Sequence, residues 1–288
     1  MTPATLPPAP TPIFDRARIA RRIEASRFDE NFVLRLVLAD LEDRLSMVTR
    51  AFSRAVIVAP AVTGLPAQLH SAKGPIAFEH IATASGPAPM DGEAFALPGR
   101  NYDLIVSLLD LQWVTDVPGY LARTRAHLAP DGLFIAAFPG GDTLSELRQA
   151  FLLADSERHG GAFARVAPMI PLKDAAGLLQ RAGFALPVAD VETHIVRYAD
   201  PLALFLELRA LGASNPLLER PSMPVSRALL GRAAEAYRER AEDQDGRVRA
   251  TLELVWLSGW SPHESQQKPL KPGSAEVSLS RVLGRPEG

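Results

Sequence analysis

The stretch RAVIVAPAVTG, residues 54–64, decides how the rest of the chain is read. Its apolar half, residues 55–59, has the length and β-branched composition of a buried strand. In an open α/β domain the turn after the first strand commonly holds a nucleotide, and glycines let its backbone approach the ligand. Here the turn has Pro60, which removes a backbone donor, and one late glycine, Gly64. The turn lacks what a tight nucleotide site needs, and a helix-like stretch is expected after it.

Strand-like and helix-like stretches alternate along the chain. Short apolar runs predict strands, at residues 55–59, 74–83, 102–113, 132–138, 186–198 and 251–260. Apolar residues three and four positions apart predict helices, at residues 13–54, 117–128, 171–182, 201–212 and 226–242. Such alternation is typical of right-handed βαβ units, so we expect a doubly wound α/β fold around a mostly parallel sheet.

Polar residues mark the starts of two further helical stretches. Asp116 is well placed to cap the helix that follows it. The turn at residues 140–143 opens another helix, in which Thr143 and Glu146 have the spacing of a capping box. Both helices are therefore expected to begin directly after these residues.

Composition limits the classes of function. The chain has 288 residues, 47% of them hydrophobic, so it can bury a sizeable core. A formal net charge of −2 gives no reason to expect a nucleic-acid partner. The absence of cysteine excludes disulfides, thiolate metal sites and a cysteine nucleophile, and fits a reducing compartment. Four arginines, Arg16, Arg18, Arg21 and Arg22, could contact an anionic surface, but a solvated helix face is the favoured interpretation.

Four segments are expected along the chain. Residues 1–12 form a proline-rich disordered tail, and residues 13–53 a helical extension. Residues 54–261 form the α/β domain, with a helical insertion at about 201–243, and residues 262–288 form a polar tail packed on or near it. No run of 18 or more apolar residues and no signal-peptide pattern occurs, so we expect a cytoplasmic protein without a transmembrane segment.

Ligands of open α/β sheets bind outside the carboxyl ends of the strands, where the strand order reverses. Glu79 follows the first strand by about the spacing at which an acid meets ribose hydroxyls, and Asp91 lies in a loop that could reach an adenine. Each could equally be an ordinary strand-end or turn carboxylate. The other candidates lie at the ends of the next two strands and suit a cofactor or an anionic substrate group, namely Gln112, Trp113, Gly140, Gly141 and Asp142. Core packing and a tight turn are the alternatives for them.

Familiar catalytic and metal-binding patterns do not occur in the sequence. The six histidines show no HxH, HExxH or HxD spacing, and there is no GxSxG or Walker motif. No metal site is predicted. Residue patterns alone therefore lead to an α/β domain with a degraded nucleotide cleft.

Several stretches resemble the family of the mitochondrial complex I assembly factor with arginine hydroxylase activity and its alphaproteobacterial relatives. The resemblance extends over most of the chain, and its matching stretches lie at residues 13–22, 91–118, 129–161, 178–184 and 258–279. GGDTLSELR, at residues 140–148, and the tail SGWSPHESQQKPLKPGSAEVSL, at residues 258–279, are specific to this family rather than to methyltransferases at large.

The resemblance implies a Rossmann-like class I methyltransferase fold with S-adenosylmethionine as the cofactor. Such a fold has a seven-stranded, mostly parallel sheet with an antiparallel last strand and helices on both faces. The resemblance places Asp91 where the adenine-contacting acid lies, and Glu79 near the ribose-contacting acid. Gln112 replaces the histidine of the family's His-Trp pair, while Trp113 is kept. The glycine-rich loop of the fold is replaced by APAVTG.

Three functions follow from these observations. The resemblance implies a protein that hydroxylates an arginine of a respiratory complex I subunit, or chaperones that subunit, in the cytoplasm or peripherally at the inner membrane through this partner. The first alternative is an S-adenosylmethionine-dependent methyltransferase with an unusual loop. The second is a non-catalytic module that binds a partner protein through the cleft or through the tail around His263 and Gln266. The sequence names neither catalytic residues nor an oxidant.

Overall fold

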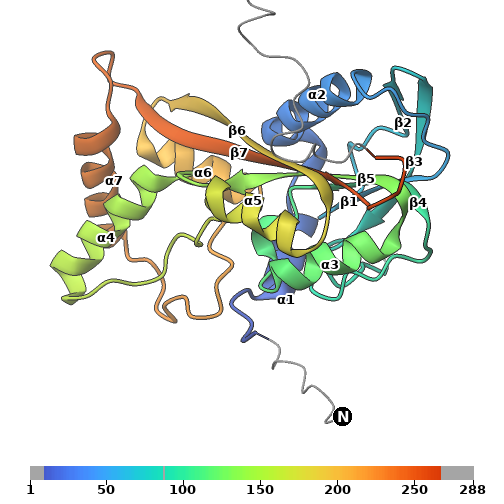
Figure 1. Cartoon of the computed structure of the whole chain (residues 1–288). Coiled ribbons are helices and arrows are strands. Elements are labelled where there is room, and N and C mark those ends of the chain that lie inside the picture. Colours follow the sequence, from blue (N-terminus) through green and yellow to red (C-terminus); the bar gives the residue numbers. More distant parts are fainter. Residues whose placement is uncertain (1–9, 87, 267–288) are drawn as a thin grey trace, which may run out of the picture.

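The computed structural model describes residues 10–86 and 88–266 (Figure 1). Most of the proline-rich segment and most of the tail at 262–288 lie outside the described residues. Seven strands of the described part form one sheet in the order β2-β3-β1-β4-β5-β7-β6. They are β1 (Ala55–Ala59), β2 (Gln68–Ser71), β3 (Gly74–Ala82), β4 (Tyr102–Leu108), β5 (Leu128–Gly140), β6 (Ala185–Tyr198) and β7 (Val248–Trp260).

The pairing of the strands fixes their directions. β1 is parallel to β3 and β4, and β4 is parallel to β5. β7 is antiparallel to both of its neighbours, β5 and β6, and β2 is antiparallel to β3. The predicted seven-stranded sheet with an antiparallel last strand is confirmed, and this is the class I methyltransferase fold.

The connection from β1 to β3 differs from the prediction. The helix expected after β1 is absent, because Pro60, Gly64 and Pro66 interrupt this short stretch. Instead the chain crosses the carboxyl end of β3, runs back as β2 and returns through a two-residue turn into β3. The His80 ring holds the Pro66 carbonyl at 2.9 Å, which fixes the crossing loop to β3.

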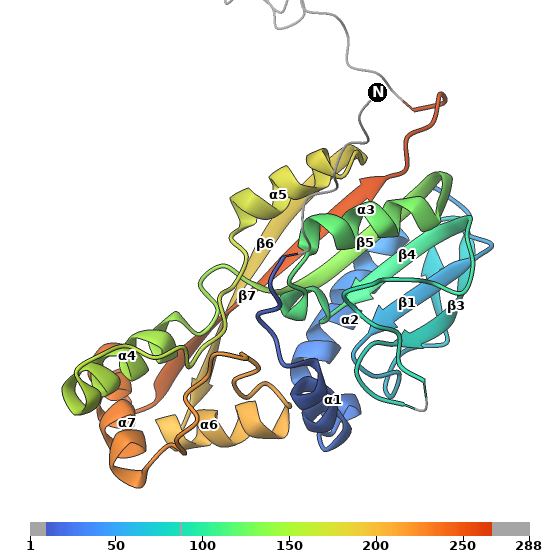
Figure 2. The ribbon, with the colours of Figure 1, turned by 90° about the horizontal axis from the view of Figure 1, so that it is seen from below.

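Helices from distant parts of the chain cover the two faces of the sheet (Figures 1 and 2). α1 (Arg16–Glu24), a short 3-10 turn η1 (Phe28–Glu30) and α2 (Phe32–Ser46) precede the sheet. α2 supplies a buried stripe to the first face, where Leu34, Val37 and Leu41 join Ile57 in one apolar core. α3 (Val117–His127) and α5 (Leu172–Arg181) cover the opposite face, where Val56 and Val58 are buried. The prediction of helices on both faces is confirmed.

Two long strands extend beyond the rest of the sheet. β5 pairs with β7 only as far as Glu253, whereas β6 and β7 stay paired to Tyr198 and Val248. Around this two-stranded arm lie α4 (Ser145–His159), α6 (Pro201–Ala210) and α7 (Arg227–Ala241), which share a separate apolar cluster with it (Figure 2). The arm therefore holds a second layer of helices beside the main sheet.

Two local predictions at strand ends are wrong. The strand expected at 102–113 ends at Leu108, because Leu109 adopts a positive φ of 53° and its amide turns to the Ala137 carbonyl. A 3-10 turn, η2 (Leu111–Trp113), follows, so Trp113 does not close the strand. The capping box is absent because the hydroxyl of Thr143 donates to the Gly140 carbonyl and α4 begins only at Ser145. The cap at Asp116 is confirmed, since its carboxylate accepts from the Gly119 amide at 2.9 Å.

The seating of α2 on the sheet can be tested by cavity formation. Leu41 is fully buried and Leu36, on the same helix, is 36% exposed. We expect Leu41→Ala to lower the free energy of unfolding by about 2–5 kcal/mol, because it leaves a cavity against β1. The matched change Leu36→Ala should cost less than about 1 kcal/mol. Urea denaturation of both variants measures the difference, and equal losses would contradict this packing.

Candidate functional site

A group of polar residues lies at the carboxyl edge of the sheet, where the strand order reverses. β1 connects toward β3 on one side, and its other neighbour is β4. Open α/β sheets bind ligands at this point. Thr83 follows β3, and Asp110 and Trp113 follow β4. We call this group the carboxyl-edge crevice.

Asp110 is the charged residue at the bottom of the crevice. Its side chain is fully buried, and Oδ1 accepts a hydrogen bond from the Thr83 hydroxyl at 2.5 Å. Oδ2 has no hydrogen-bond partner among the described residues. Burial raises the pKa of Asp110 above the usual range of a carboxyl group, and the positive charge of Arg16 opposes this shift. The crevice therefore favours a cation or a proton.

Arg16 supplies that cation from α1. Its guanidinium donates to the carbonyl of Trp113 at 3.2 Å and to that of Thr83 at 3.3 Å. A Cβ atom at Gly92 would lie 2.5 Å from Nη2 of Arg16, so a larger residue there would shift the guanidinium from this position. The interpretation of Arg16 as part of a solvated helix face is wrong. The first helix instead anchors the N-terminal extension in the crevice.

S-adenosylmethionine is the cofactor that the fold implies, and the crevice residues do not form a cradle for it. Pro60 offers no amide at the start of the turn. The Pro60 carbonyl accepts from the amides of Ala84 and Ser85 at 3.1 and 3.0 Å, which draws the end of β3 across the end of β1. The guanidinium of Arg16 bridges the segments that follow β3 and β4 through the carbonyls of Thr83 and Trp113. A cofactor that used these carbonyls would have to displace Arg16.

Glu79 and Asp91 lie apart from the crevice. Glu79 is in the middle of β3, paired with Val56, so the prediction that it ends its strand is wrong. Its carboxylate faces the start of β4, where it accepts from the Tyr102 hydroxyl at 3.1 Å and lies 3.7 Å from Arg54. Asp91 is exposed and closes a local turn by accepting from the Glu93 amide at 3.0 Å. Their proposed roles in cofactor binding stay predictions.

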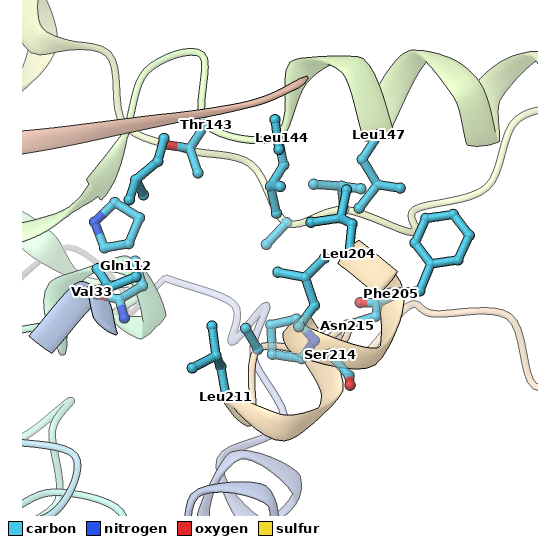
Figure 3. Close-up of a pocket in the computed structure, with 18 of the residues that line it drawn as sticks. Val33, Gln112, Thr143, Leu144, Leu147, Leu204, Phe205, Leu211, Ser214 and Asn215 are labelled. Atoms are coloured by element: carbon cyan, nitrogen blue, oxygen red, sulfur yellow. The ribbon is translucent and has the colours of Figure 1, made fainter. Parts of the chain in front are cut away.

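An apolar cavity of about 470 Å³ opens between the sheet and the helices of the arm (Figure 3). Gln112 and Val33 lie on one side of it, Leu144 and Leu147 of the α4 region on another, and Leu204 of α6 faces them. Gln112 and Trp113 both line this cavity. We refer to it as the apolar cavity. Its volume is in the range of small-molecule sites in proteins.

The glycine turn after β5 borders the cavity through Thr143. Gly140 is buried, and a Cβ atom there would lie 2.8 Å from the Ile170 carbonyl. The amide of Asp142 donates to the Glu253 carboxylate at 2.8 Å. Because three residues separate Gly141 from the start of α4 and Glu253 takes the Asp142 amide, this turn does not present a helix N-terminus. Its role in substrate binding stays a prediction.

Two leucines on the cavity wall have strained backbones. Leu109 and Leu144 adopt positive φ angles of 53° and 55°, a region that β-carbon-bearing residues rarely occupy. Both line the apolar cavity, after β4 and β5 respectively. Such strain persists only where the surrounding structure imposes it, and it is concentrated at functional sites. Gln112 adds a buried Oε1 atom with no partner among the described residues.

The tail residues that the structure describes are held to the main domain. Gln266 donates to the Asp131 carboxylate and to the Ser261 carbonyl, both at 2.8 Å. His263 pairs with the Ser265 hydroxyl at 2.8 Å.

Within residues 10–86 and 88–266, no group of three or more His, Cys, Asp or Glu side chains could hold a metal ion. No helix of the same residues is long and apolar enough to cross a membrane.

The raised pKa of Asp110 leads to a test by pH. The folded state holds the Asp110 proton more tightly than the unfolded state, so this carboxyl stabilises the fold at low pH and the contribution is lost as pH rises through the folded pKa. In the wild type, this carboxyl should make the free energy of unfolding fall by at most about 1.4 kcal/mol per pH unit above about pH 4. Asp110→Asn should remove that contribution. Asp91→Asn, an exposed control, should leave the dependence unchanged. Urea unfolding across pH 4–8 measures it, and parallel profiles for wild type and Asp110→Asn would contradict the assignment.

Comparisons with known proteins give relatives of two kinds. The protein named Arginine-hydroxylase NDUFAF5, mitochondrial, is 37% identical over 190 residues in Danio rerio and 38% identical over 192 residues in Homo sapiens. These matches cover 66% and 67% of this chain, but the chain spans only 59% and 55% of the two relatives. The malonyl-[acyl-carrier protein] O-methyltransferase of Halorhodospira halophila is 31% identical over 293 residues, which cover 94% of this chain and 96% of that protein.

No family model matches the chain. The full-length relative nevertheless fixes the family, and the fold agrees with it. The chain belongs to the class I methyltransferase-like family that includes the NDUFAF5 arginine hydroxylases and the bacterial malonyl-[acyl-carrier protein] O-methyltransferases.

Proposed function

We propose that this protein binds an arginine side chain of a partner protein in the carboxyl-edge crevice and hydroxylates it, with a respiratory complex I subunit as the partner. The observation that carries the proposal is the guanidinium of Arg16, held between the carbonyls of Thr83 and Trp113 beside the buried Asp110. The relatives named as arginine hydroxylases support it.

The crevice has the chemistry that recognises a guanidinium. A guanidinium is planar and has five N–H donors but no acceptor, so it needs carbonyl and carboxylate oxygens around it. Two backbone carbonyls supply such oxygens to Arg16, and the Oδ2 atom of Asp110, which makes no hydrogen bond among the described residues, is a further acceptor for an incoming guanidinium. Arg16 stands where the arginine of a partner would bind, and displacement of α1 would open the site.

The chemistry after binding needs co-reactants from outside the chain. Hydroxylation replaces one C–H bond by C–OH, so dioxygen would supply the oxygen atom and a two-electron donor would reduce its second atom to water. In this proposal the residues of the chain bind and orient the arginine and keep water away from it. Binding without this step would be the chaperone function.

Mass spectrometry of complex I subunits tests the proposal. We expect one arginine of one subunit to be lighter by the mass of a single oxygen atom in cells that lack this protein than in wild-type cells. Wild type and Asp91→Asn should restore the mass, whereas Asp110→Asn should reduce the modified fraction at least tenfold, because a charged hydrogen-bond acceptor for the guanidinium is lost. Copurification of a subunit whose arginine masses never change would contradict hydroxylation and support the non-catalytic binding module.

A methyltransferase that uses S-adenosylmethionine is the second candidate, favoured by the match over 96% of the malonyl-[acyl-carrier protein] O-methyltransferase. The crevice argues against tight cofactor binding, because Pro60 lacks an amide and Arg16 occupies the space. The loss of two or three hydrogen bonds to a charged ligand, at about 1.5–3 kcal/mol each, weakens binding by several orders of magnitude.

Calorimetry separates the two candidates. We expect titration of S-adenosylmethionine into the wild-type protein to give no saturable heat up to about 1 mM, a binding free energy weaker than about −4 kcal/mol. Asp91→Ala serves as the control variant. Micromolar binding to wild type that Asp91→Ala abolishes would contradict this expectation and support the methyltransferase.

A further inference from the structure

The apolar cavity has one charged rim, formed by two arginines of α1. Arg18 and Arg22 lie one turn apart on the same face of the helix, and both line the cavity. No Asp or Glu is among its lining residues. Neither arginine lies within 4.0 Å of a carboxylate of the described residues, although the Arg18 side chain donates to the Asn215 carbonyl at 3.3 Å. The rim therefore has positive charge without a matching negative charge.

Most charged neighbours of the two arginines are themselves arginines. Burial and these positive charges lower the pKa of both Arg18 and Arg22, and the negative charge of Asp15 opposes the shift at Arg18. The neighbours are Arg21, Arg209 and Arg220, and Arg220 already uses the nearby Asp15 at 3.0 Å. By contrast Arg165, the third arginine on the cavity, is paired in two-pronged fashion with the buried Asp155 at 2.5 and 2.7 Å. Half-buried arginines without a counterion are costly unless an anion joins them.

The wall beyond the arginines is apolar. Leu147 of α4 faces Leu204 of α6 (Figure 3), and the rings of Phe151 and Phe205 on the same two helices lie 5.9 Å apart. The four labelled leucines Leu144, Leu147, Leu204 and Leu211 point into the open space of Figure 3. Burial of a hydrocarbon chain against this wall is favourable, because it removes apolar surface from water. The two arginines at the rim would bind an anionic head group at the end of that chain.

We propose that the apolar cavity binds a single-chain amphiphile with an anionic head, a carboxylate or a phosphate, whose alkyl chain lies among the leucines and whose head pairs with Arg18 and Arg22. This site is distinct from the arginine-binding crevice. The cavity includes none of Arg16, Thr83 or Asp110 and shares only Trp113 with the crevice. The two sites share α1, but the tests below measure amphiphile binding alone, so their result can be told apart from a failure of the proposed function.

Head-group and chain-length comparisons on the wild-type protein test the proposal without any variant. Dodecanoate and dodecyl phosphate, below their micelle concentrations, should bind saturably by calorimetry and change the fluorescence of Trp113 on the cavity wall. Dodecyltrimethylammonium, with the same chain, should bind at least tenfold more weakly. Shortening the chain should weaken binding by up to about fourfold per methylene. Equal affinity for anionic and cationic heads would overturn the proposal.

A charge variant adds a second, independent readout. Arg18→Gln with Arg22→Gln should lower the affinity for dodecanoate at least tenfold while affinity for uncharged dodecanol stays the same. The matched control is Arg27→Gln, an exposed arginine of the same segment that is not on the cavity. Wild-type affinity of the double variant for dodecanoate would overturn the proposal.

Free amphiphiles and bilayers offer the same head-group chemistry, and a sedimentation assay distinguishes them. We expect dodecanoate monomers to bind, with no sedimentation of the protein on phosphatidylcholine vesicles that contain phosphatidylglycerol. Sedimentation with vesicles without monomer binding would overturn the cavity as the site and place the arginines on a membrane surface instead.

Discussion

The hydrogen bonds of one guanidinium connect the N-terminal extension to the carboxyl edge of the sheet, beside the backbone bonds that join Ile13 and Asp15 to residues 216–218. Arg16 joins α1 to the carbonyl ends of β3 and β4 through Thr83 and Trp113. Because α1 is held there, its next turns bring Arg18 and Arg22 to the rim of the apolar cavity. The same anchoring leads into α2, whose leucines bury one face of the sheet. The crevice, the cavity and half of the core thus depend on where the N-terminal extension is held.

Much of the fold could be predicted from the sequence because its signals are local. The apolar run at β1 matches the strand residue for residue, and the leucine spacing of α2 and the cap at Asp116 follow from short-range geometry. The β2–β3 hairpin could not, because β2 is only four residues long, with an alternating burial pattern that its sequence does not reveal. The exact end of β4 could not be predicted either, because the positive φ of Leu109 has no signal in the sequence.

The site was less predictable because its residues depend on tertiary contacts. Asp110 had a signal, an acid within the apolar run LLDLQW, since a charge there must be buried or end the strand. Arg16 gave none, because a cluster of arginines at helical spacing looks the same whether it faces water or a crevice. Glu79 was predicted from its distance along the chain and Asp91 from its place in a loop. The register of β3 turns Glu79 toward Tyr102, at the start of β4. Burial, which decides which charges matter, is a property of the folded chain.

The occupied crevice also limits what kind of arginine could enter it. Arg16 is tethered to its site, so it competes with an effective concentration on the order of millimolar or higher. A free arginine makes the same few hydrogen bonds but loses its translational freedom, so it cannot displace a tethered copy of itself at ordinary concentrations. An arginine on a protein can, provided that the rest of the partner buries additional surface and compensates for the release of α1. Under the proposed function, the geometry of Arg16 would select for a folded or extended polypeptide as the ligand, and the surface around α1 would matter to recognition as much as the crevice itself.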